Sequence, residues 1–161
     1  AGNVRITLNP GVFTYDLAYS LLPFTSNTVF ITDITGAEVK QTLEDAIDYV
    51  LNGGSSGAFP YGAGIRYEAT KEGTLGTRVK KIEVFDFKAN KWVPIDAKKT
   101  YMLAVNSYIA KGKDGYTTLG KITSQKRGRD THLSDTKIFI DYLKEKKEIG
   151  KPKSTNVIFK Y

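Results

Sequence analysis

An α+β fold, with helices packed on a mixed β-sheet, is what the sequence predicts. Stretches in which apolar residues recur at helical spacing are interspersed among stretches rich in β-branched and aromatic residues, which suit a pleated surface. The chain has 161 residues, of which 40% are hydrophobic, so it can bury a sizeable core as a single domain over residues 1–161. Disorder and an all-helical bundle are therefore excluded as main descriptions.

The first helix is expected over residues 14–22. Thr14 can cap its N-terminus, apolar residues follow at spacings of three and four, and Pro23 ends it. Residues 27–34 then predict a strand, because they are rich in β-branched residues and alternate apolar with polar side chains. Phe24 is thereby placed at the corner between helix and strand.

The clearest element is a helix that begins at Thr35. Thr35 and Glu38 have the spacing of a capping box, in which each side chain bonds a free backbone N–H of the helix start. Gly53 and Gly54 supply the left-handed conformation that ends such a helix. The apolar residues between them share one face: Val39, Leu43, Ala46, Ile47, Val50 and Leu51. The pattern predicts a long helix with one buried stripe.

Residues 53–64 form a glycine-rich loop that superficially resembles a phosphate-binding loop. Because no Gly-Lys-Ser/Thr ending follows, the pattern favours an ordinary or substrate-flanking loop. The rest of the chain is expected to contain further strands and one further helix. The strands are 65–70, 78–88, 91–95, 101–107 and 156–161, with a short strand-like stretch at 6–8 and a hairpin turn at 88–91; the helix runs from a cap at 133–135 to Lys147, with Phe139, Tyr142 and Leu143 facing inward.

The lack of cysteine and the single histidine exclude many kinds of catalytic centre. Disulfides, iron–sulfur clusters, thiolate nucleophiles and zinc fingers cannot be built, so we expect no metal site and no catalytic residue in this chain. The lone histidine, His132, is interpreted as a surface or capping residue. No apolar stretch is long enough to span a bilayer, and the chain starts with Ala1 instead of Met, so we expect a piece of a longer protein.

The net charge of +7 lies entirely in the last third of the chain. Residues 1–110 hold 11 basic and 11 acidic side chains, whereas residues 111–161 hold 13 basic and 6 acidic ones. Such an excess is typical of proteins with an acidic partner, so a nucleic-acid-binding module that uses this third is one alternative. A plain interaction domain without a small-molecule site is another.

The loop after the strand at 101–107 carries the most informative cluster. Tyr108, Asp114 and Tyr116 follow one another in a turn punctuated by glycines. Taken alone, Asp114 fits a local bond from side chain to backbone. Arg5 can reach a carboxylate or a phosphate with two parallel hydrogen bonds, although a lone arginine near a terminus is ordinarily solvated.

Several short motifs, taken in order, give these residues a second interpretation. They are Gly2-Asn-Val-Arg5, Tyr15-Asp-Leu-Ala-Tyr-Ser-Leu-Leu-Pro-Phe24, Ile34-Thr-Gly-Ala-Glu38, Gly64-Ile-Arg-Tyr67, Lys99-Thr-Tyr-Met-Leu-Ala-Val-Asn106 and Gly112-Lys-Asp-Gly-Tyr116. In this combination, over about residues 1–120, the chain resembles the C-terminal domain of 5′-nucleotidases. The resemblance implies the α+β fold of that domain.

The resemblance also implies roles for four residues. The nucleobase would be sandwiched between Phe24 and Tyr108, a stacking contact that every base can make. The ribose hydroxyls would donate to Asp114, and Arg5 would point toward the phosphate.

The same resemblance implies partners outside this chain. Proteins of this kind pair such a domain with an N-terminal metallophosphoesterase domain, whose two divalent metal ions hydrolyse the phosphate ester. The expected partners are therefore a nucleotide or nucleoside and that second domain, with no nucleic acid and no membrane span. The expected location is periplasmic or at the cell surface.

Two positions depart from the usual motif. Lys113 stands where a second glycine is usual, so a lysine would be strained there if the position requires a positive φ. Tyr108 stands where phenylalanine is frequent, which keeps the ring and adds a hydroxyl that needs a partner.

Overall fold

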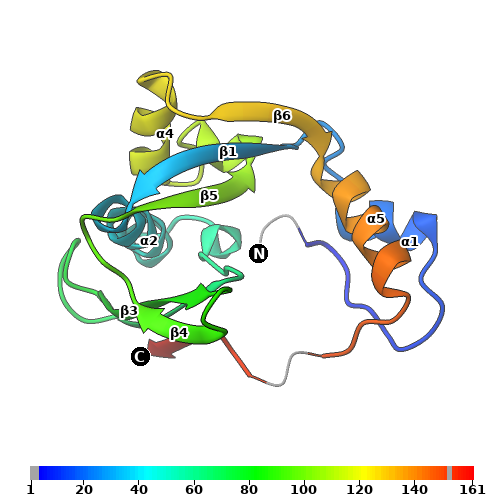
Figure 1. Cartoon of the computed structure of the whole chain (residues 1–161), viewed down its shortest axis with the longest axis horizontal. Helices are drawn as coiled ribbons and strands as arrows, with labels where there is room; N and C mark the ends of the chain where they lie inside the picture. Colours follow the sequence, from blue (N-terminus) through cyan, green and yellow to red (C-terminus); the bar gives the residue numbers. More distant parts are fainter. Residues whose placement is uncertain (1–3, 152–153) are drawn as a thin grey trace.

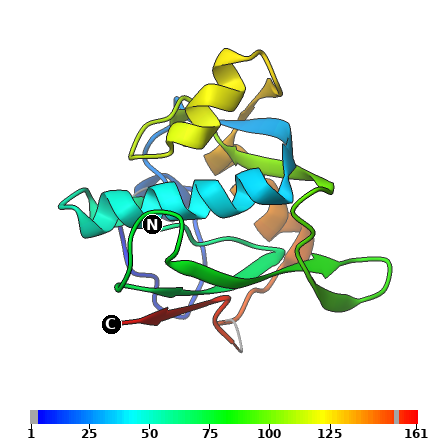
Figure 2. The same ribbon diagram turned by 90° about the vertical axis from the view of Figure 1, so that its left-hand side faces the viewer.

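Two β-sheets lie on either side of one long helix, α2 (Gly36–Leu51), in the computed structural model, which describes residues 4–151 and 154–161. Figure 1 and Figure 2 show α2 between the sheets. The first sheet has the antiparallel order β5-β1-β6. The second has the order β4-β3-β2-β7, in which β7 runs parallel to β2 and the other pairs are antiparallel. The α+β prediction is confirmed.

The strands and helices largely follow the predicted segments, with three additions. The strands are β1 (Thr28–Thr35), β2 (Ile65–Thr70), β3 (Val79–Asp86), β4 (Lys91–Pro94), β5 (Thr100–Asn106), β6 (Arg129–Ser134) and β7 (Val157–Lys160); the helices besides α2 are α1 (Tyr15–Leu21), α3 (Ser107–Ala110), α4 (Thr117–Ser124) and α5 (Asp135–Lys146), with a 3₁₀ turn η1 (Ser56–Ala58). The sequence did not predict α3, α4 or β6. The expectation of a strand at residues 6–8 is wrong, because these residues pair with no sheet.

Helix α2 begins and ends where its sequence signals predict. The Thr35 hydroxyl accepts from the Glu38 N–H at 3.2 Å, and the Thr35 N–H donates to the Glu38 carboxylate at 2.8 Å. Arg127 donates to both oxygens of the same carboxylate, at 2.6 and 3.0 Å. The Arg127 guanidinium, together with the Thr35 bonds, lowers the pKa of Glu38 to about 2. Gly53, just after the helix, has the expected positive φ of 88°.

The hydrophobic core forms around α2. Its predicted stripe is buried at Val39, Leu43, Ala46 and Ile47. Helix α2 packs against β3 of the second sheet on one side and against β1 and α4 on the other. The core residues contributed by these neighbours are Ile34, Tyr67, Ala69, Val79, Ile82, Leu119 and Ile122. A helix covered from both sides can hold loops from both sheets in place.

One charged side chain of α2, Glu44, is completely buried. Its two carboxylate oxygens accept hydrogen bonds from the backbone N–H groups of Gly76, at 2.9 Å, and Val79, at 2.6 Å. Burying a carboxylate is tolerated only when its oxygens are hydrogen-bonded in this way. Glu44 therefore fastens the connection between β2 and β3 to the helix.

Helices α1 and α5 pack against each other beside the sheets (Figure 1). The Phe13 and Phe139 rings meet edge to face at 5.7 Å, and the Thr136 hydroxyl donates to the carbonyl of Leu22 at 2.8 Å. The expectation that Tyr142 faces inward is wrong: 48% of it is exposed, and Ile140 is buried instead.

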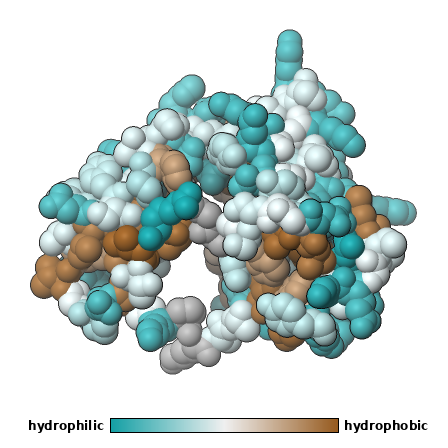
Figure 3. Space-filling view, turned by 180° about the vertical axis from the view of Figure 1, so that it is seen from behind, coloured by the Kyte–Doolittle hydropathy of each residue, from teal (hydrophilic) through white to brown (hydrophobic). Residues whose placement is uncertain are grey.

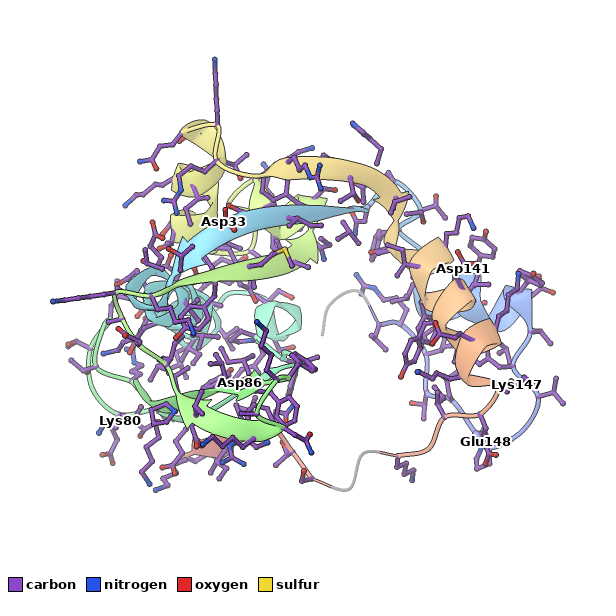
Figure 4. All side chains as sticks on the ribbon, in the orientation of Figure 1. Asp33, Lys80, Asp86, Asp141, Lys147 and Glu148 are labelled. Atoms are coloured by element: carbon purple, nitrogen blue, oxygen red, sulfur yellow. The ribbon has the colours of Figure 1, made fainter. Side chains whose placement is uncertain are left out.

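Charged side chains are spread over both parts of the molecule. Figure 4 shows Asp141 and Lys147 on the α5 side, and Lys80 and Asp86 toward opposite ends of β3. Asp86 accepts from the backbone N–H groups of Lys88 and Ala89, at 2.9 and 3.0 Å, and so shapes the turn between β3 and β4.

Candidate functional site

The four residues singled out by the sequence all line one pocket. It has a volume of about 830 Å³, and Arg5, Phe24, Tyr108 and Asp114 contribute to its walls. This volume lies within the range of about 300–1,000 Å³ that is usual for small-molecule sites. Figure 3 shows the surface hollowed between the α1–α5 side and the sheet side, with hydrophobic residues on both flanks.

The pocket brings together three parts of the chain that are distant in sequence. Arg5 and Phe24 flank α1, Tyr108 and Asp114 follow β5, and residues 55–59 and Tyr61 belong to the glycine-rich loop. That loop therefore lines the pocket. Residues 1–3 of the Gly-Asn-Val-Arg motif lie outside the described residues.

Arg5 and Phe24 contact each other and together form one wall of the pocket. The Arg5 backbone N–H donates to the carbonyl of Leu21 at 3.0 Å, and the Phe24 carbonyl accepts from Asn27 at 2.9 Å. These bonds place the Arg5 guanidinium carbon 5.0 Å from the centre of the Phe24 ring, a cation–π contact. Within the described residues Arg5 pairs with no carboxylate. Phe24 keeps 41% of its surface exposed, which leaves ring surface for a ligand.

Tyr108 is presented to the pocket by a short helix, α3. Asn106, the last residue of β5, caps this helix by accepting from the Ile109 N–H at 3.0 Å. The Ser107 hydroxyl accepts from the Thr28 N–H at 3.1 Å and ties the helix start to β1. Tyr108 is 45% exposed. Its hydroxyl donates to Asp114 Oδ1 at 3.3 Å, and the negative charge of Asp114 raises the pKa of Tyr108.

The loop that carries Asp114 has an unusual backbone. Three of its residues have positive φ: Gly112 at 80°, Asp114 at 53° and Gly115 at 80°. Lys113 is not among them, so the strain that a lysine would suffer at a positive φ does not arise. Asp114 itself carries the left-handed conformation, which aspartate tolerates better than most residues.

The same loop packs closely against α2. A Cβ atom added to Gly115 would lie 2.3 Å from the Cβ of Tyr49, so only glycine fits there. On its other side, the Tyr116 hydroxyl donates to the carbonyl of Ala58 at 2.8 Å, which joins the loop to η1. Burial raises the pKa of Tyr116, so this phenol remains a donor.

Asp45 of α2 is a positioning residue that sequence reasoning missed. Its carboxylate accepts from the Thr117 hydroxyl at 2.8 Å and from the Thr118 N–H at 2.7 Å, and so holds the start of α4. Burial opposes its charge, but these bonds and one from Gln41 prevail and lower the pKa of Asp45. The sequence signal that could have identified Asp45 is its position next to the buried apolar stripe of α2.

The remaining candidates lie elsewhere. His132 is on β6 with its side chain 88% exposed, and it does not line the pocket. In the part of the chain that the structure describes, no group of three or more His, Cys, Asp or Glu residues is arranged to hold a metal ion. Over the same ranges, no helix is long and apolar enough to cross a bilayer.

The excess positive charge also lies away from the pocket. Among the described lining residues, Arg5 is the one basic side chain. Several cations beyond residue 110 are paired with carboxylates instead: Arg127 with Glu38, Lys137 with Asp141, Lys146 with Glu145 and Lys160 with Glu68. These placements give no support to the nucleic-acid alternative.

Fold and pocket together define a small α+β domain, whose pocket offers aromatic rings, one carboxylate and one arginine. Residues 1–121 match the family model described as "5'-nucleotidase, C-terminal domain". The chain belongs to this family, as its motifs predicted.

Relatives show the same assignment over nearly the whole chain. The chain is 50% identical over 161 residues to a probable 5′-nucleotidase of Treponema pallidum and 44% identical over 162 residues to an NAD 5′-nucleotidase of Haemophilus influenzae. Each match covers 99% of this chain and 27% of the relative, so the chain spans about a quarter of these proteins.

Solved structures agree with the fold. The NAD nucleotidase of Haemophilus influenzae superposes with a TM-score of 0.92 at 45% identity, over 99% of this chain and 28% of that one. The 5′-nucleotidase precursor of Thermus thermophilus superposes with a TM-score of 0.85 at 33% identity, over 98% of this chain and 30% of that one.

Proposed function

We propose that this chain is the nucleoside-recognition domain of a 5′-nucleotidase. In this proposal the base stacks between Phe24 and Tyr108, the ribose hydroxyls donate to Asp114, and Arg5 approaches the phosphate. One observation carries the proposal: these four residues, which the resemblance implied from separate motifs, line the same pocket of about 830 Å³.

The chemistry of each wall supports these roles. Base stacking on an aromatic ring is worth about 1–3 kcal/mol and tolerates different bases. Because Arg5 lies over the Phe24 ring, a base would use ring surface that the guanidinium leaves open. An ionised carboxylate is an acceptor for paired hydroxyl donors, and Asp114 lies beside Tyr108 where a stacked nucleoside would carry its sugar.

Hydrolysis would be carried out by a second domain. In this proposal an N-terminal metallophosphoesterase domain holds two divalent metal ions, which activate water and stabilise the leaving oxygen. The present domain contributes binding and orientation, which lower the entropy barrier of the reaction. Among the candidate substrates are 5′-nucleotides and NAD, since the relatives are named for them.

Calorimetric titration of this chain with adenosine tests the proposal directly. We expect saturable one-site binding and no release of phosphate from AMP or NAD, even with added divalent metal. Adding the partner domain on the same polypeptide should restore hydrolysis. Turnover by this chain alone, or failure of any nucleoside to bind, contradicts the proposal.

The periplasmic or cell-surface location stays part of the proposal. Fractionation of cells that express the natural protein, followed by detection with an antibody to this domain, tests it. Recovery in the cytoplasmic fraction alone would contradict it.

A further inference from the structure

The Tyr108 hydroxyl joins the two groups to which the proposed function assigns the base and the ribose, the Tyr108 ring and the Asp114 carboxylate. Its ring is one of the stacking surfaces, while its hydroxyl donates to Asp114 Oδ1 at 3.3 Å. Within the described chain, this is the hydrogen bond that orients the Asp114 carboxylate. We propose that this hydroxyl is a specificity-determining group, which couples stacking of the base to recognition of the ribose hydroxyls. This inference rests on the proposed function.

The backbone around Asp114 is already held in place without the hydroxyl. The Gly112 N–H donates to the carbonyl of Ile109 at 2.9 Å, and the Tyr116 N–H donates to that of Lys113 at 3.2 Å. The Tyr116 hydroxyl and Asp45 fasten the far side of the loop. What remains free is rotation of the Asp114 side chain, and the bond from Tyr108 restrains that rotation.

A restrained carboxylate still has room for a sugar. An ionised carboxylate offers about four lone-pair sites, and the phenol uses one of them. The others suffice for two ribose hydroxyls. The phenol oxygen lies in the plane of the ring and is bonded to Asp114. A base stacked on Tyr108 therefore lies at a defined distance and direction from that carboxylate. A nucleoside that lacks the 2′-hydroxyl then leaves an acceptor unpaired, and such sites reject the incomplete ligand.

The Tyr108→Phe variant isolates the hydroxyl because it retains the stacking ring. We expect it to weaken adenosine binding by about 3- to 10-fold, the net effect of losing one ordinary hydrogen bond, because the bond to Asp114 is long at 3.3 Å. Binding of 2′-deoxyadenosine should change by less than about twofold, since that ligand makes less use of the carboxylate. The preference for ribose over deoxyribose should fall accordingly. Calorimetric titration with both nucleosides measures this, and Tyr19→Phe, which removes an exposed phenol hydroxyl outside the pocket, is the control.

A second readout needs no ligand. In the Asp114→Asn variant the carboxylate charge beside Tyr108 is removed, so the Tyr108 phenol should ionise at lower pH than in the wild type. Ultraviolet difference titration of Tyr108→Phe against its parent, in both backgrounds, assigns this ionisation. An unchanged phenol ionisation overturns the inference.

The outcomes separate the two proposals. If the wild type prefers adenosine and Tyr108→Phe keeps or increases that preference, the hydroxyl does not couple base and ribose, and only this inference is overturned. If the wild type binds no nucleoside, the proposed function is overturned, and the inference with it.

Discussion

The guanidinium of Arg5 lies over the ring of Phe24, with 5.0 Å between the guanidinium carbon and the ring centre. The two residues are separated by the whole of α1, yet the bond from the Arg5 N–H to Leu21 returns the chain to the end of that helix. A cation that is already stacked on one ring loses less side-chain freedom when it meets an anion. Arg5 is thus held near the pocket before any ligand arrives.

The first prediction separates the charge of Arg5 from its packing. In Arg5→Met an unbranched side chain can still cover the Phe24 ring, but no positive charge remains. We expect AMP to bind about 3- to 10-fold more weakly, while adenosine changes by less than about twofold. Calorimetry at low and high salt measures both, and the salt dependence of AMP binding should decrease. An equal loss for the two ligands would mean that Arg5 supports the ring and does not meet the phosphate.

The second prediction concerns Phe24 as a stacking surface. Phe24→Ala should weaken adenosine binding by about 1–3 kcal/mol, which is about 5- to 150-fold in Kd. Phe87→Ala is the matched control, because Phe87 is 81% exposed and does not line the pocket. Fluorescence or calorimetric titration distinguishes the two variants. Equal affinities for Phe24→Ala and Phe87→Ala would show that the base stacks elsewhere.

The third prediction concerns the backbone of the Asp114 loop. Gly115→Ala places a methyl group 2.3 Å from the Tyr49 Cβ and also requires an alanine at φ 80°. The variant should lose about 1–3 kcal/mol of stability from the strained φ alone, with a further loss from the displaced loop, and it should bind adenosine more weakly. Gly53→Ala is the control, since Gly53 has a similar φ of 88° but open space around it. Thermal unfolding should show the larger decrease for Gly115→Ala; equal decreases would contradict the contact with Tyr49.

The fourth prediction concerns stability at low pH. The pKa of Glu38 is lowered from 4.5 to about 2 in the folded protein, chiefly by Arg127. The unfolded chain therefore binds a proton here at higher pH than the folded one, and the stabilising contribution is complete above about pH 4.5 and lost as the pH falls toward 2. Urea unfolding across this window should show a steeper decline for the wild type than for Glu38→Gln, which cannot titrate. Parallel profiles would contradict the role of this ion pair.

Local sequence signals predicted α2 correctly, because the residues that cap it and those that form its buried stripe are close together in the sequence. Thr35 and Glu38 cap it, and the buried positions recur within the helix itself. Helix α4 lacks such signals: its sequence contains three Thr and a Gly, all poor helix formers. It is held by Asp45 of a distant helix and by burial of Leu119 and Ile122, which a single-sequence pattern does not show.

The candidate site likewise has features that the sequence predicted and features that it did not. The resemblance identified Arg5, Phe24, Tyr108 and Asp114, and the structure brings them to one pocket. It could not reveal that Asp114 takes the positive φ while Lys113 does not, because that depends on how the loop meets Tyr49. Strand β6 escaped prediction for a related reason: it is polar and lies at a sheet edge, where alternation of apolar residues is not required.

The buried carboxylate of Glu44 has a consequence for the slow motions of the domain. Its oxygens accept the amide hydrogens of Gly76, in a connection whose other residues are largely exposed, and of Val79, the first residue of β3. Their exchange with deuterated solvent requires that these bonds to the buried carboxylate break, so the connection must move away from α2. These two amides should therefore exchange more slowly than the other amides of the same exposed connection.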